Sequence, residues 1–415
     1  MPAPERRTRW DLIAAAVLTV GVVVVCTVLW WTSDARRTTL ITAAGPVPDV
    51  SAPAAGPAGV PVAVTEAWRA PSPATPVPLV RDGTVVTGAA GVVTGRDLHS
   101  GAVRWSYRRD RPLCTVAAAF GAVVTVYRRG ETCSEVTALQ WTDGRRGPQR
   151  TGPVEAPTRL VAAGNQVAAS GRHYLEVWRS DLVRTLTYGR LPTPAQPATQ
   201  PRPDCVHGSM ALDSAVESGR RLAVVEQCPG ERVRITVQRS EPRQPDHPEV
   251  TFSTLLQGTQ AQIVALSRNM VAVALPDPPR LVVLDEQGEA SAEHPLSVPD
   301  ADLRKNPPGG VVDVTKTPTQ AYWFTGSATV ALDIADLRPR WTRPGSLGTG
   351  SEAAAGRLLL PVPGALAVLD TTSGEQVGAL PVDRGGYHGP VGTVSANGVV
   401  LEQRGDTLVA LRPTG

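Results

Sequence analysis

The stretch ALAVLDTTSGEQVGALPV (365–382) consists of a run of small apolar residues, a polar turn that contains a glycine, and a second apolar run. Similar phrases occur at GVVTGRDLHSGAVRWSY (91–107), PRLVVLDEQGEASAEHPL (279–296) and SATVALDIADLRPRWTR (327–343). In each of them a strand-like run is followed by a polar residue, usually Asp, then by a turn of about four residues and a second strand-like run. The phrase predicts a repeated strand–turn–strand unit.

The polar residue after the apolar strand recurs at intervals that average close to 45 residues. It falls at eight positions, which are Asp97, Gln140, Arg179, Gln238, Asp285, Asp333, Asp370 and Arg412. A period of about 40–50 residues with four short strands per unit is typical of a β-propeller. We therefore expect an all-β fold with a single β-propeller over 64–415. It has eight blades, or seven if the weak unit at 232–252 is not a blade. The longest interval contains five prolines within 190–204, which indicate a loop insertion.

The two ends of the repeat region predict how the ring closes. NGVVLEQRGDTLVALRP (397–413) supplies the inner strands of a last blade and stops where an outer strand is expected. AVTEAWRA (63–70) has the shape of that missing strand, with Trp68 in the position that Trp105 and Trp341 occupy in their units. Pairing the first strand with the last blade would close the ring and remove exposed strand edges.

An apolar segment precedes the repeats. LIAAAVLTVGVVVVCTVLWW (12–31) has twenty residues without a charge, and such a helix spans the roughly 30 Å hydrocarbon core of a bilayer. A cleaved signal peptide is the alternative, but its apolar region is usually about 7–15 residues long. We expect a short cytoplasmic tail over 1–11, an uncleaved transmembrane helix over 12–31 and a Pro/Ala-rich linker over 32–63 that spaces the propeller from the membrane.

Four cysteines lie outside the apolar segment, namely Cys114, Cys133, Cys205 and Cys228. Their number is even, neither close pair has CxxC spacing, and no histidine cluster accompanies them, which disfavours zinc and favours two disulfides in an oxidising compartment. Four unrelated buried thiols are the alternative. The expected pairs are Cys114–Cys133 and Cys205–Cys228. We therefore expect a single-pass protein of the cytoplasmic membrane with its amino terminus inside and its propeller extracytoplasmic.

The composition agrees with many short strands joined by turns, because the chain contains 39 Gly and 39 Pro and only 4% aromatic residues. The net charge is +3, and no basic stripe interleaved with aromatic residues occurs, so nucleic acid is not an expected partner. Lys305 and Lys316 are the only lysines among the basic residues. We interpret this bias toward arginine as that of a GC-rich bacterial genome.

The phrase A-L-D-x-x-x-G-x-x-x-W resembles the blade repeat of the pyrroloquinoline-quinone-type, or quinoprotein-like, β-propellers. The residues that match it, closely or loosely, are Asp97, Gly101, Trp105, Asp333, Trp341, Asp370 and Gly374. The resemblance implies that the tryptophans pack between blades and that Asp and Gly shape the turns. These residues, and Trp68 with them, are therefore expected to be structural.

The chemistry of that family is not expected here. Its quinone-dependent dehydrogenases carry a disulfide between adjacent cysteines, a calcium site and an Asp base, whereas this sequence has no Cys-Cys dipeptide. HExxH, Walker A and GxSxG motifs are absent from the sequence. We expect no catalytic residue, cofactor or metal, and a non-enzymatic scaffold or binding module of the cell envelope with other envelope proteins as partners. The alternatives are a quinone- or metal-dependent oxidoreductase and a ligand-sensing domain for wall-derived molecules.

Overall fold

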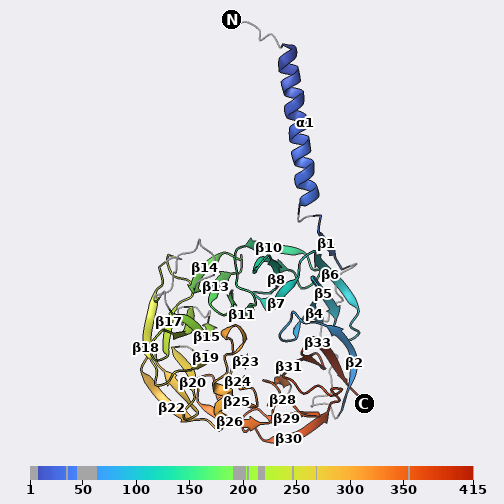
Figure 1. Cartoon of the computed structure of the whole chain (residues 1–415). Helices are drawn as coiled ribbons and strands as arrows, with labels where there is room; N and C mark the ends of the chain where they lie inside the picture. The colour runs from blue at the N-terminus through green and yellow to red at the C-terminus, as the bar shows by residue number, and fades with distance from the viewer. Residues whose placement is uncertain are drawn as a thin grey trace.

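The chain forms an eight-bladed β-propeller preceded by one apolar helix (Figure 1). The computed structural model describes residues 8–33, 36–43, 63–189, 202, 205–213, 220–244, 247–267, 269–353 and 356–414. The predicted fold class is confirmed, and the unit at 232–252 belongs to a true blade. Each of the eight polar positions that set the period lies in, or directly after, the third strand of its blade. Most of the cytoplasmic tail, of the Pro/Ala segment and of the proline-rich insertion at 190–204 lies outside the described residues.

Each blade is an antiparallel sheet whose strands run in chain order from the centre of the ring to its rim. Blades 1 to 4 are built from β3 (Leu79–Arg81), β4 (Thr84–Ala89), β5 (Val92–Asp97) and β6 (Val103–Arg109); β7 (Leu113–Ala119), β8 (Ala122–Arg129), β9 (Thr132–Leu139) and β10 (Arg146–Thr151); β11 (Arg159–Ala163), β12 (Gln166–Ser170), β13 (Tyr174–Arg179) and β14 (Arg184–Gly189); and β15 (Val206–Asp213), β16 (Arg221–Gln227), β17 (Arg234–Arg239) and β18 (Val250–Leu255).

The remaining blades follow the same plan, except that the last one ends in a strand from the start of the domain. Blades 5 to 8 are built from β19 (Gln262–Ser267), β20 (Met270–Leu275), β21 (Arg280–Leu284) and β22 (Ala290–Pro295); β23 (Asp313–Lys316), β24 (Gln320–Phe324), β25 (Ala328–Asp333) and β26 (Pro339–Pro344); β27 (Ser351–Ala353), β28 (Arg357–Val362), β29 (Ala365–Asp370) and β30 (Gln376–Pro381); and β31 (Val391–Ala396), β32 (Val399–Arg404), β33 (Thr407–Pro413) and β2 (Val64–Pro71).

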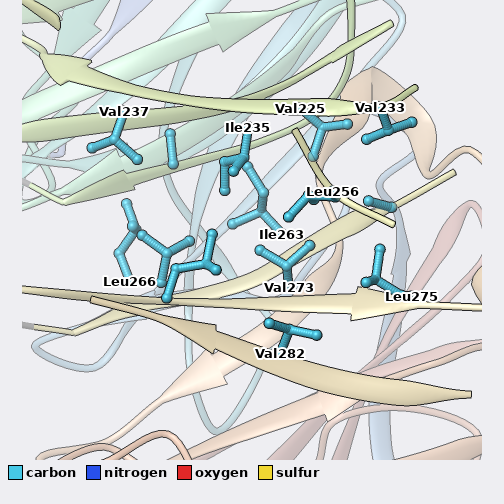
Figure 2. Close-up of a cluster of buried hydrophobic side chains, with 14 of the residues drawn as sticks. Val225, Val233, Ile235, Val237, Leu256, Ile263, Leu266, Val273, Leu275 and Val282 are labelled. Atoms are coloured by element: carbon cyan, nitrogen blue, oxygen red, sulfur yellow. The ribbon is translucent and has the colours of Figure 1, made fainter. Parts of the chain in front are cut away.

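The hydrophobic core lies between neighbouring blades. The two middle strands of a blade are buried on both faces, as in β20, whereas an outer strand such as β22 alternates between exposed and half-buried residues. Figure 2 shows the interface between blades 4 and 5, where Val225 and Ile235 face Ile263 and Val273. Short β-branched side chains fit this arrangement because they pack closely on pleated surfaces.

A tryptophan on the outer strand of one blade docks onto the next blade. Trp105 in β6 of blade 1 is fully buried, and its indole N–H donates to the backbone carbonyl of Trp141 in blade 2 at 2.8 Å. Its ring covers Gly144, where a Cβ would lie only 2.6 Å from the indole. The same two contacts join Trp68 to Leu98 and Gly101, and Trp341 to Thr371 and Gly374.

The Asp residues of the repeat hold the turns onto which these tryptophans dock. The Asp97 carboxylate accepts hydrogen bonds from the backbone N–H groups of His99 and Ser100, and Gly101 adopts a φ of +70°. Asp370 and Gly374 form the same turn in blade 7. A positive φ is accessible to glycine without steric cost, and the absent Cβ also leaves room for the indole.

Blade 6 departs from this arrangement. Its turn after Asp333 has Leu337, with a φ of +57°, where the turns of blades 1, 2, 5 and 7 have glycine; blade 3 has Leu182, with a φ of +63°, in the corresponding turn. The third residue of the preceding outer strand is Ala292 instead of a tryptophan, and Ala292 and Leu337 belong to the same hydrophobic cluster. The leucine side chain therefore fills the space that an indole fills elsewhere.

The ring closes as the sequence predicts. β2 pairs antiparallel with β33, and Trp68 lies opposite Ala410 in the register. The first strand of the propeller thus completes the last blade, and it covers the edge of β33 that would otherwise be unpaired.

The start of the chain differs from the expectation. Among the described residues, one helix is long and apolar enough to cross a membrane, namely α1 (Arg9–Thr32). Five residues later the chain enters β1 (Thr38–Ile41), which pairs with β6 as a fifth strand of blade 1 although it lies in the segment that we assigned to the linker. The Pro/Ala segment therefore connects β1 to β2, two strands fixed on the ring, and does not space the propeller from the helix.

Candidate binding face

One face of the ring, here called the connector face, carries the links between consecutive blades and the turns between second and third strands. These segments share a face because neighbouring strands within a blade run in opposite directions. The link between blades 5 and 6, residues 299–312, contains α2 (Asp300–Leu303) and the 3-10 helix η1 (Pro308–Gly310). We call it the bridging segment, because it contacts blades on both sides of the central channel.

The near end of the bridging segment is bonded to blades 5 and 6. The Gln262 side-chain amide donates to the backbone carbonyls of Asp302 and Lys305 at 3.2 and 2.7 Å. The buried Asp302 carboxylate accepts from the hydroxyls of Thr325 and Ser327 at 2.9 and 2.6 Å. Burial alone would raise the pKa of Asp302, but the hydrogen bonds from Ser327, Lys305 and Thr325 hold it below its ordinary value.

The far end reaches blades 3 and 4. The Ser170 hydroxyl donates to the Gly309 carbonyl at 2.5 Å. Gly309 and Gly310 have φ values of +62° and +68°, and a Cβ at Gly309 would lie 2.8 Å from the Ser170 carbonyl oxygen. A Cβ at Gly310 would lie 3.3 Å from the ring of His207. The two glycines therefore allow the segment to approach the blades closely.

A polar cavity of about 790 Å³ opens between the bridging segment and blades 3 and 4. Its volume is within the range of about 300–1,000 Å³ that small-molecule sites occupy. The side chains that give it its polar character are Glu155, Arg159, Arg172, His173, His207, Gln227 and Asn306. The Glu155 carboxylate accepts from the His173 ring at 2.8 Å and from the backbone N–H of Tyr174 at 2.9 Å, so its orientation is fixed.

His207 is the most buried charged or titratable group of this cavity, with 4% of its surface exposed. Its Nε2 donates to the Gly171 carbonyl at 2.9 Å, while Nδ1 has no hydrogen-bond partner among the described residues. Burial lowers the pKa of His207 to about 4. The imidazole is therefore neutral near pH 7, and its Nδ1 is a buried hydrogen-bond acceptor that lacks a donor among the described residues.

His207 makes the folded protein less stable in acid. Because its pKa is about 4 in the folded state and about 6.5 in an unfolded chain, the unfolded state binds the proton first. The free energy of unfolding should fall by up to about 3 kcal/mol as the pH drops from about 6.5 toward 4. Denaturant unfolding across this range should show that loss in the wild type and a clearly smaller one in His207→Gln. His99→Gln, at an exposed turn, is the matched control, and equal slopes for the two variants would contradict the assignment.

The central channel also opens on the connector face. Its mouth, of about 470 Å³, is bordered by residues that include Arg159, Asp313 and Tyr387. Deeper in the ring, a space of about 580 Å³ is lined mainly by aliphatic residues and by Lys316. The side chain of Lys316 is accessible from the channel, but protein surrounds it on all other sides. Its Nζ donates to the Leu266 carbonyl at 3.3 Å, and burial lowers the pKa of Lys316.

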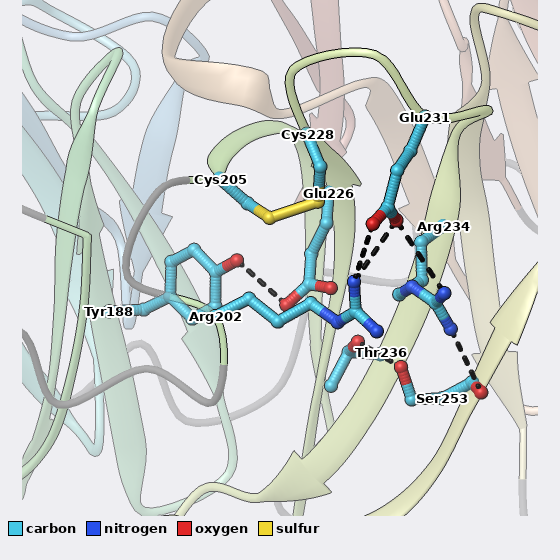
Figure 3. Close-up of a disulfide and its surroundings, with 9 residues drawn as sticks. All are labelled: Tyr188, Arg202, Cys205, Glu226, Cys228, Glu231, Arg234, Thr236 and Ser253. Carbon is cyan, nitrogen blue, oxygen red and sulfur yellow. Dashed lines mark hydrogen bonds and ion pairs between the residues drawn. A yellow bond between two sulfur atoms is a disulfide. The ribbon is translucent and has the colours of Figure 1, made fainter.

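Both disulfides are present in the predicted pairs, Cys114–Cys133 and Cys205–Cys228. Each joins the first strand of its blade, or the residue before it, to the segment around the turn between the second and third strands. Figure 3 shows Cys205–Cys228 beside Glu226, whose carboxylate accepts from the Tyr188 hydroxyl at 2.9 Å. The two sulfurs and the Glu226 carboxylate lie within 4.8 Å of one another. Among the described residues, this is the one group of side chains whose spacing resembles that of metal ligands. It is not a preformed metal site, because its two sulfurs are bonded to each other.

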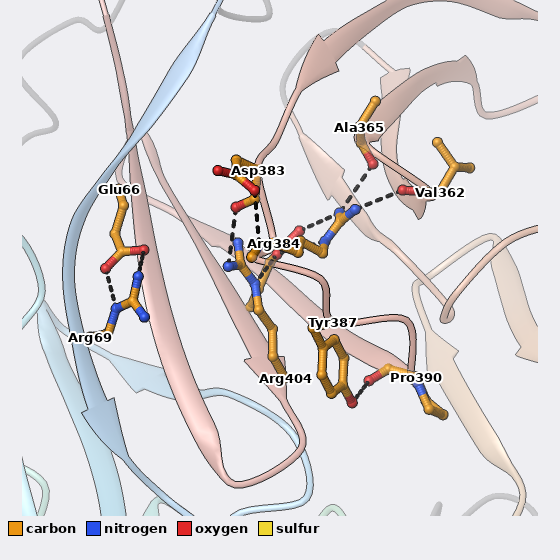
Figure 4. Close-up of polar contacts among 11 residues, drawn as sticks. Glu66, Arg69, Val362, Ala365, Asp383, Arg384, Tyr387, Pro390 and Arg404 are labelled. Carbon is orange, nitrogen blue, oxygen red and sulfur yellow. Dashed lines mark hydrogen bonds and ion pairs between the residues drawn. The ribbon is translucent and has the colours of Figure 1, made fainter.

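A buried ion-pair triad fixes the junction of blades 7 and 8 (Figure 4). Glu402 is fully buried and accepts from the guanidinium groups of Arg384 and Arg404, each at 2.7 Å. Arg384 also donates to the backbone carbonyls of Val362 and Ala365 at 2.7 and 3.0 Å. Since the two arginines have side-chain exposures of 4% and 7%, this triad is part of the scaffold and does not face a ligand.

The residues singled out in the sequence and the residues of the cavity are different sets. The tryptophan, Asp and Gly positions of the repeat lie at blade junctions and near the rim, and the cavity contains none of them. His207 and Lys316 were visible in the sequence only as one of six histidines and one of two lysines. The rarity of lysine was the single signal that could have drawn attention to the channel.

Comparison with known proteins supports the fold and adds no family. No family model matches the chain, and no curated protein matches it significantly in sequence. Among solved structures, the chain is similar to Sqt1 of Saccharomyces cerevisiae, with a TM-score of 0.53 and 10% identity over 84% of this chain and 98% of the other. It is also similar to the dihydro-heme d1 dehydrogenase NirN, with a TM-score of 0.50 and 14% identity over 77% and 68%. At these identities the likeness shows a β-propeller and nothing about ligands or activity.

Proposed function

We propose that this chain is a single-pass membrane protein whose extracytoplasmic propeller is a non-enzymatic scaffold of the cell envelope that binds a partner protein at its connector face. The apolar helix α1 supports membrane anchoring with the amino terminus inside, and the two disulfides support an oxidising compartment for the ring. The repeat phrase supports a place in the non-catalytic branch of the quinoprotein-like propellers of GC-rich bacteria.

The observation that carries the proposal is the rigid polar cavity beside the channel mouth. Its walls come from blades 3 and 4 and from the bridging segment, which is bonded to the ring at both ends. A surface of this kind presents fixed donors and acceptors to a partner at little entropic cost. The cavity volume also favours a second candidate function, the sensing of a small wall-derived molecule.

The cavity geometry supports binding over catalysis. The one serine–histidine contact there, between the Ser170 hydroxyl and His207 Nε2, measures 3.4 Å. Ser170 is fully buried and donates to the Gly309 carbonyl, while His207 Nδ1 has, within the described part of the chain, no carboxylate partner of the kind that orients a catalytic base. Neither group is arranged to activate a nucleophile.

A photo-crosslinking amino acid placed at Arg172 tests this proposal in intact cells. Arg172 is exposed at the cavity rim, and Asn165 is exposed on the opposite face of the same blade and serves as the matched control. We expect a discrete protein adduct from position 172, its loss when Asn306→Arg fills the cavity, and no adduct from position 165. Adducts from both positions, or from neither, would contradict a partner-binding connector face.

A further inference from the structure

Arginines gather at the corner of the ring where the chain enters blade 1. β1 pairs with the end of β6, so that Thr38 and Thr39 lie opposite Arg109 and Arg108. The Asp110 backbone N–H donates to the Arg37 carbonyl at 3.2 Å, and the Arg128 N–H donates to the Pro112 carbonyl at 2.9 Å. Three segments thus converge at what we call the entry corner, whose arginines are Arg36, Arg37, Arg108, Arg109, Arg111, Arg128 and Arg129.

The entry corner holds the excess positive charge of the protein. Against its seven arginines stand three acidic residues, Asp110, Glu131 and Glu135, so its excess is larger than the +3 of the whole chain. Glu135 is buried and pairs with Arg109 and Arg129 at 3.0 and 3.2 Å. The remaining side chains include four exposed guanidinium groups, those of Arg36, Arg37, Arg108 and Arg128.

The corner also has a shape that suits a small anionic group. A shallow cavity of about 390 Å³ is lined there by four arginines and one acidic residue, Asp110, together with Ala90 and Pro112; the arginines are Arg37, Arg108, Arg109 and Arg111. A planar guanidinium group binds phosphate oxygens in a bidentate manner. Several such groups around one hollow therefore favour an anionic ligand, such as a phosphate diester, over an apolar ligand.

The entry corner lies close to the membrane end of α1. The helix ends at Thr32 and β1 begins at Thr38, and six residue steps span at most about 20 Å. Trp31, at the end of the helix, has the Arg36 guanidinium 4.5 Å from its ring centroid. Tryptophans at a helix end lie at the level of the lipid headgroups. Figure 1 shows α1 leaving the outer edge of the ring beside β1 and β6.

We propose that the entry corner binds the phosphate groups of anionic phospholipids in the leaflet from which α1 emerges, and so holds the rim of blades 1 and 2 against the bilayer. This inference rests on the membrane anchoring proposed above. The attraction of several arginines to an anionic surface adds to the covalent tether and is screened by salt. The ring is then oriented by lipid charge as well as by the short connection to α1.

The full chain in lipid nanodiscs provides the test. Amide hydrogen exchange across 104–112 is compared between phosphatidylcholine discs and discs that contain about 30% phosphatidylglycerol. We expect exchange at least about fivefold slower in the anionic discs and a loss of this protection in about 0.5 M salt. Equal exchange in the two kinds of disc would overturn the inference.

Two triple variants separate this site from general charge effects. Arg37→Gln/Arg108→Gln/Arg128→Gln should lose the lipid-dependent protection. A matched control on blade 6 replaces Arg338 and Arg340, which are exposed, and Arg343, which is half-buried, and should keep it. Loss of protection in both variants, or in neither, would contradict a specific site at the entry corner.

Two further experiments show whether the phosphate comes from lipid or from free anions, and test the membrane anchoring separately from the lipid site. Inorganic phosphate added to phosphatidylcholine discs should not reproduce the protection; if it does, the corner is a free-anion site and the lipid assignment is wrong. Alkaline carbonate extraction of native membranes reports on anchoring alone. Release of the chain would refute the anchoring and the lipid site together, whereas a retained chain with equal exchange would refute the lipid site only.

Discussion

Deletion of β2 is expected to leave a protein that cannot close its ring and that aggregates. The strand pairs with β33 along its whole length, so its loss strips the last blade of its outer strand and exposes the β33 edge to other chains. The deletion also removes Trp68 from the contact with Leu98 and Gly101 that joins blade 8 to blade 1. Because Trp68 is half-buried, losing that contact alone costs less than the about 3–5 kcal/mol of a fully buried tryptophan.

Thermal melting and size-exclusion chromatography of the full chain in detergent measure this effect. The matched control deletes eight residues, 47–54, from the Pro/Ala segment, and it should melt at the wild-type temperature. If the β2 deletion also melts there and elutes with the wild type, another strand closes the ring.

Trp105→Ala is expected to cause a large loss of stability at a blade junction. Trp105 is fully buried and its indole N–H is bonded to the Trp141 carbonyl, so truncation leaves both a cavity and an unpaired acceptor. We expect a loss of about 3–5 kcal/mol in the free energy of unfolding. Trp105→Phe keeps most of the packing and should lose about 1–3 kcal/mol.

Two comparisons make this expectation specific. Val103→Ala, at an exposed position of the same strand, should change the free energy of unfolding by no more than about 0.5 kcal/mol. Gly144→Ala should destabilise the wild type, because its Cβ would meet the indole at 2.6 Å, but it should cost less in the Trp105→Ala background. Additive effects in the double variant would show that the indole does not pack against Gly144.

The blade repeat could be predicted because its signals are local. The Asp97 turn is built from hydrogen bonds between residues two or three apart, and its glycine follows at a fixed distance, so the pattern appears directly in the sequence. The disulfides were predicted for the same reason, since each closes a loop of 19 or 23 residues within one blade. Leu337 shows the limit, because a leucine in a glycine position is understandable only once Ala292 of the neighbouring blade is seen beside it.

The candidate site could not be predicted because it depends on contacts that are distant in the chain. Ser170 and Gly309 are 139 residues apart and have no shared motif or spacing. The unpaired Nδ1 of His207 follows from burial by the bridging segment, which no local pattern reveals. β1 was missed for a similar reason, since four residues without a turn signal gain their strand conformation from β6, which lies more than sixty residues later.

The way the ring closes makes the fold dependent on complete synthesis. Pro71 and Thr407 are paired across the closure although 336 residues separate them. At about 5–20 residues per second, β2 waits on the order of half a minute after it leaves the ribosome before its partner emerges. A chain cut short by a premature stop or a nick before β33 therefore keeps two unsatisfied strand edges at its N-terminal end and its last blade, which proteases and chaperones recognise. Only a finished polypeptide hides them, so the final blade distinguishes intact molecules from fragments.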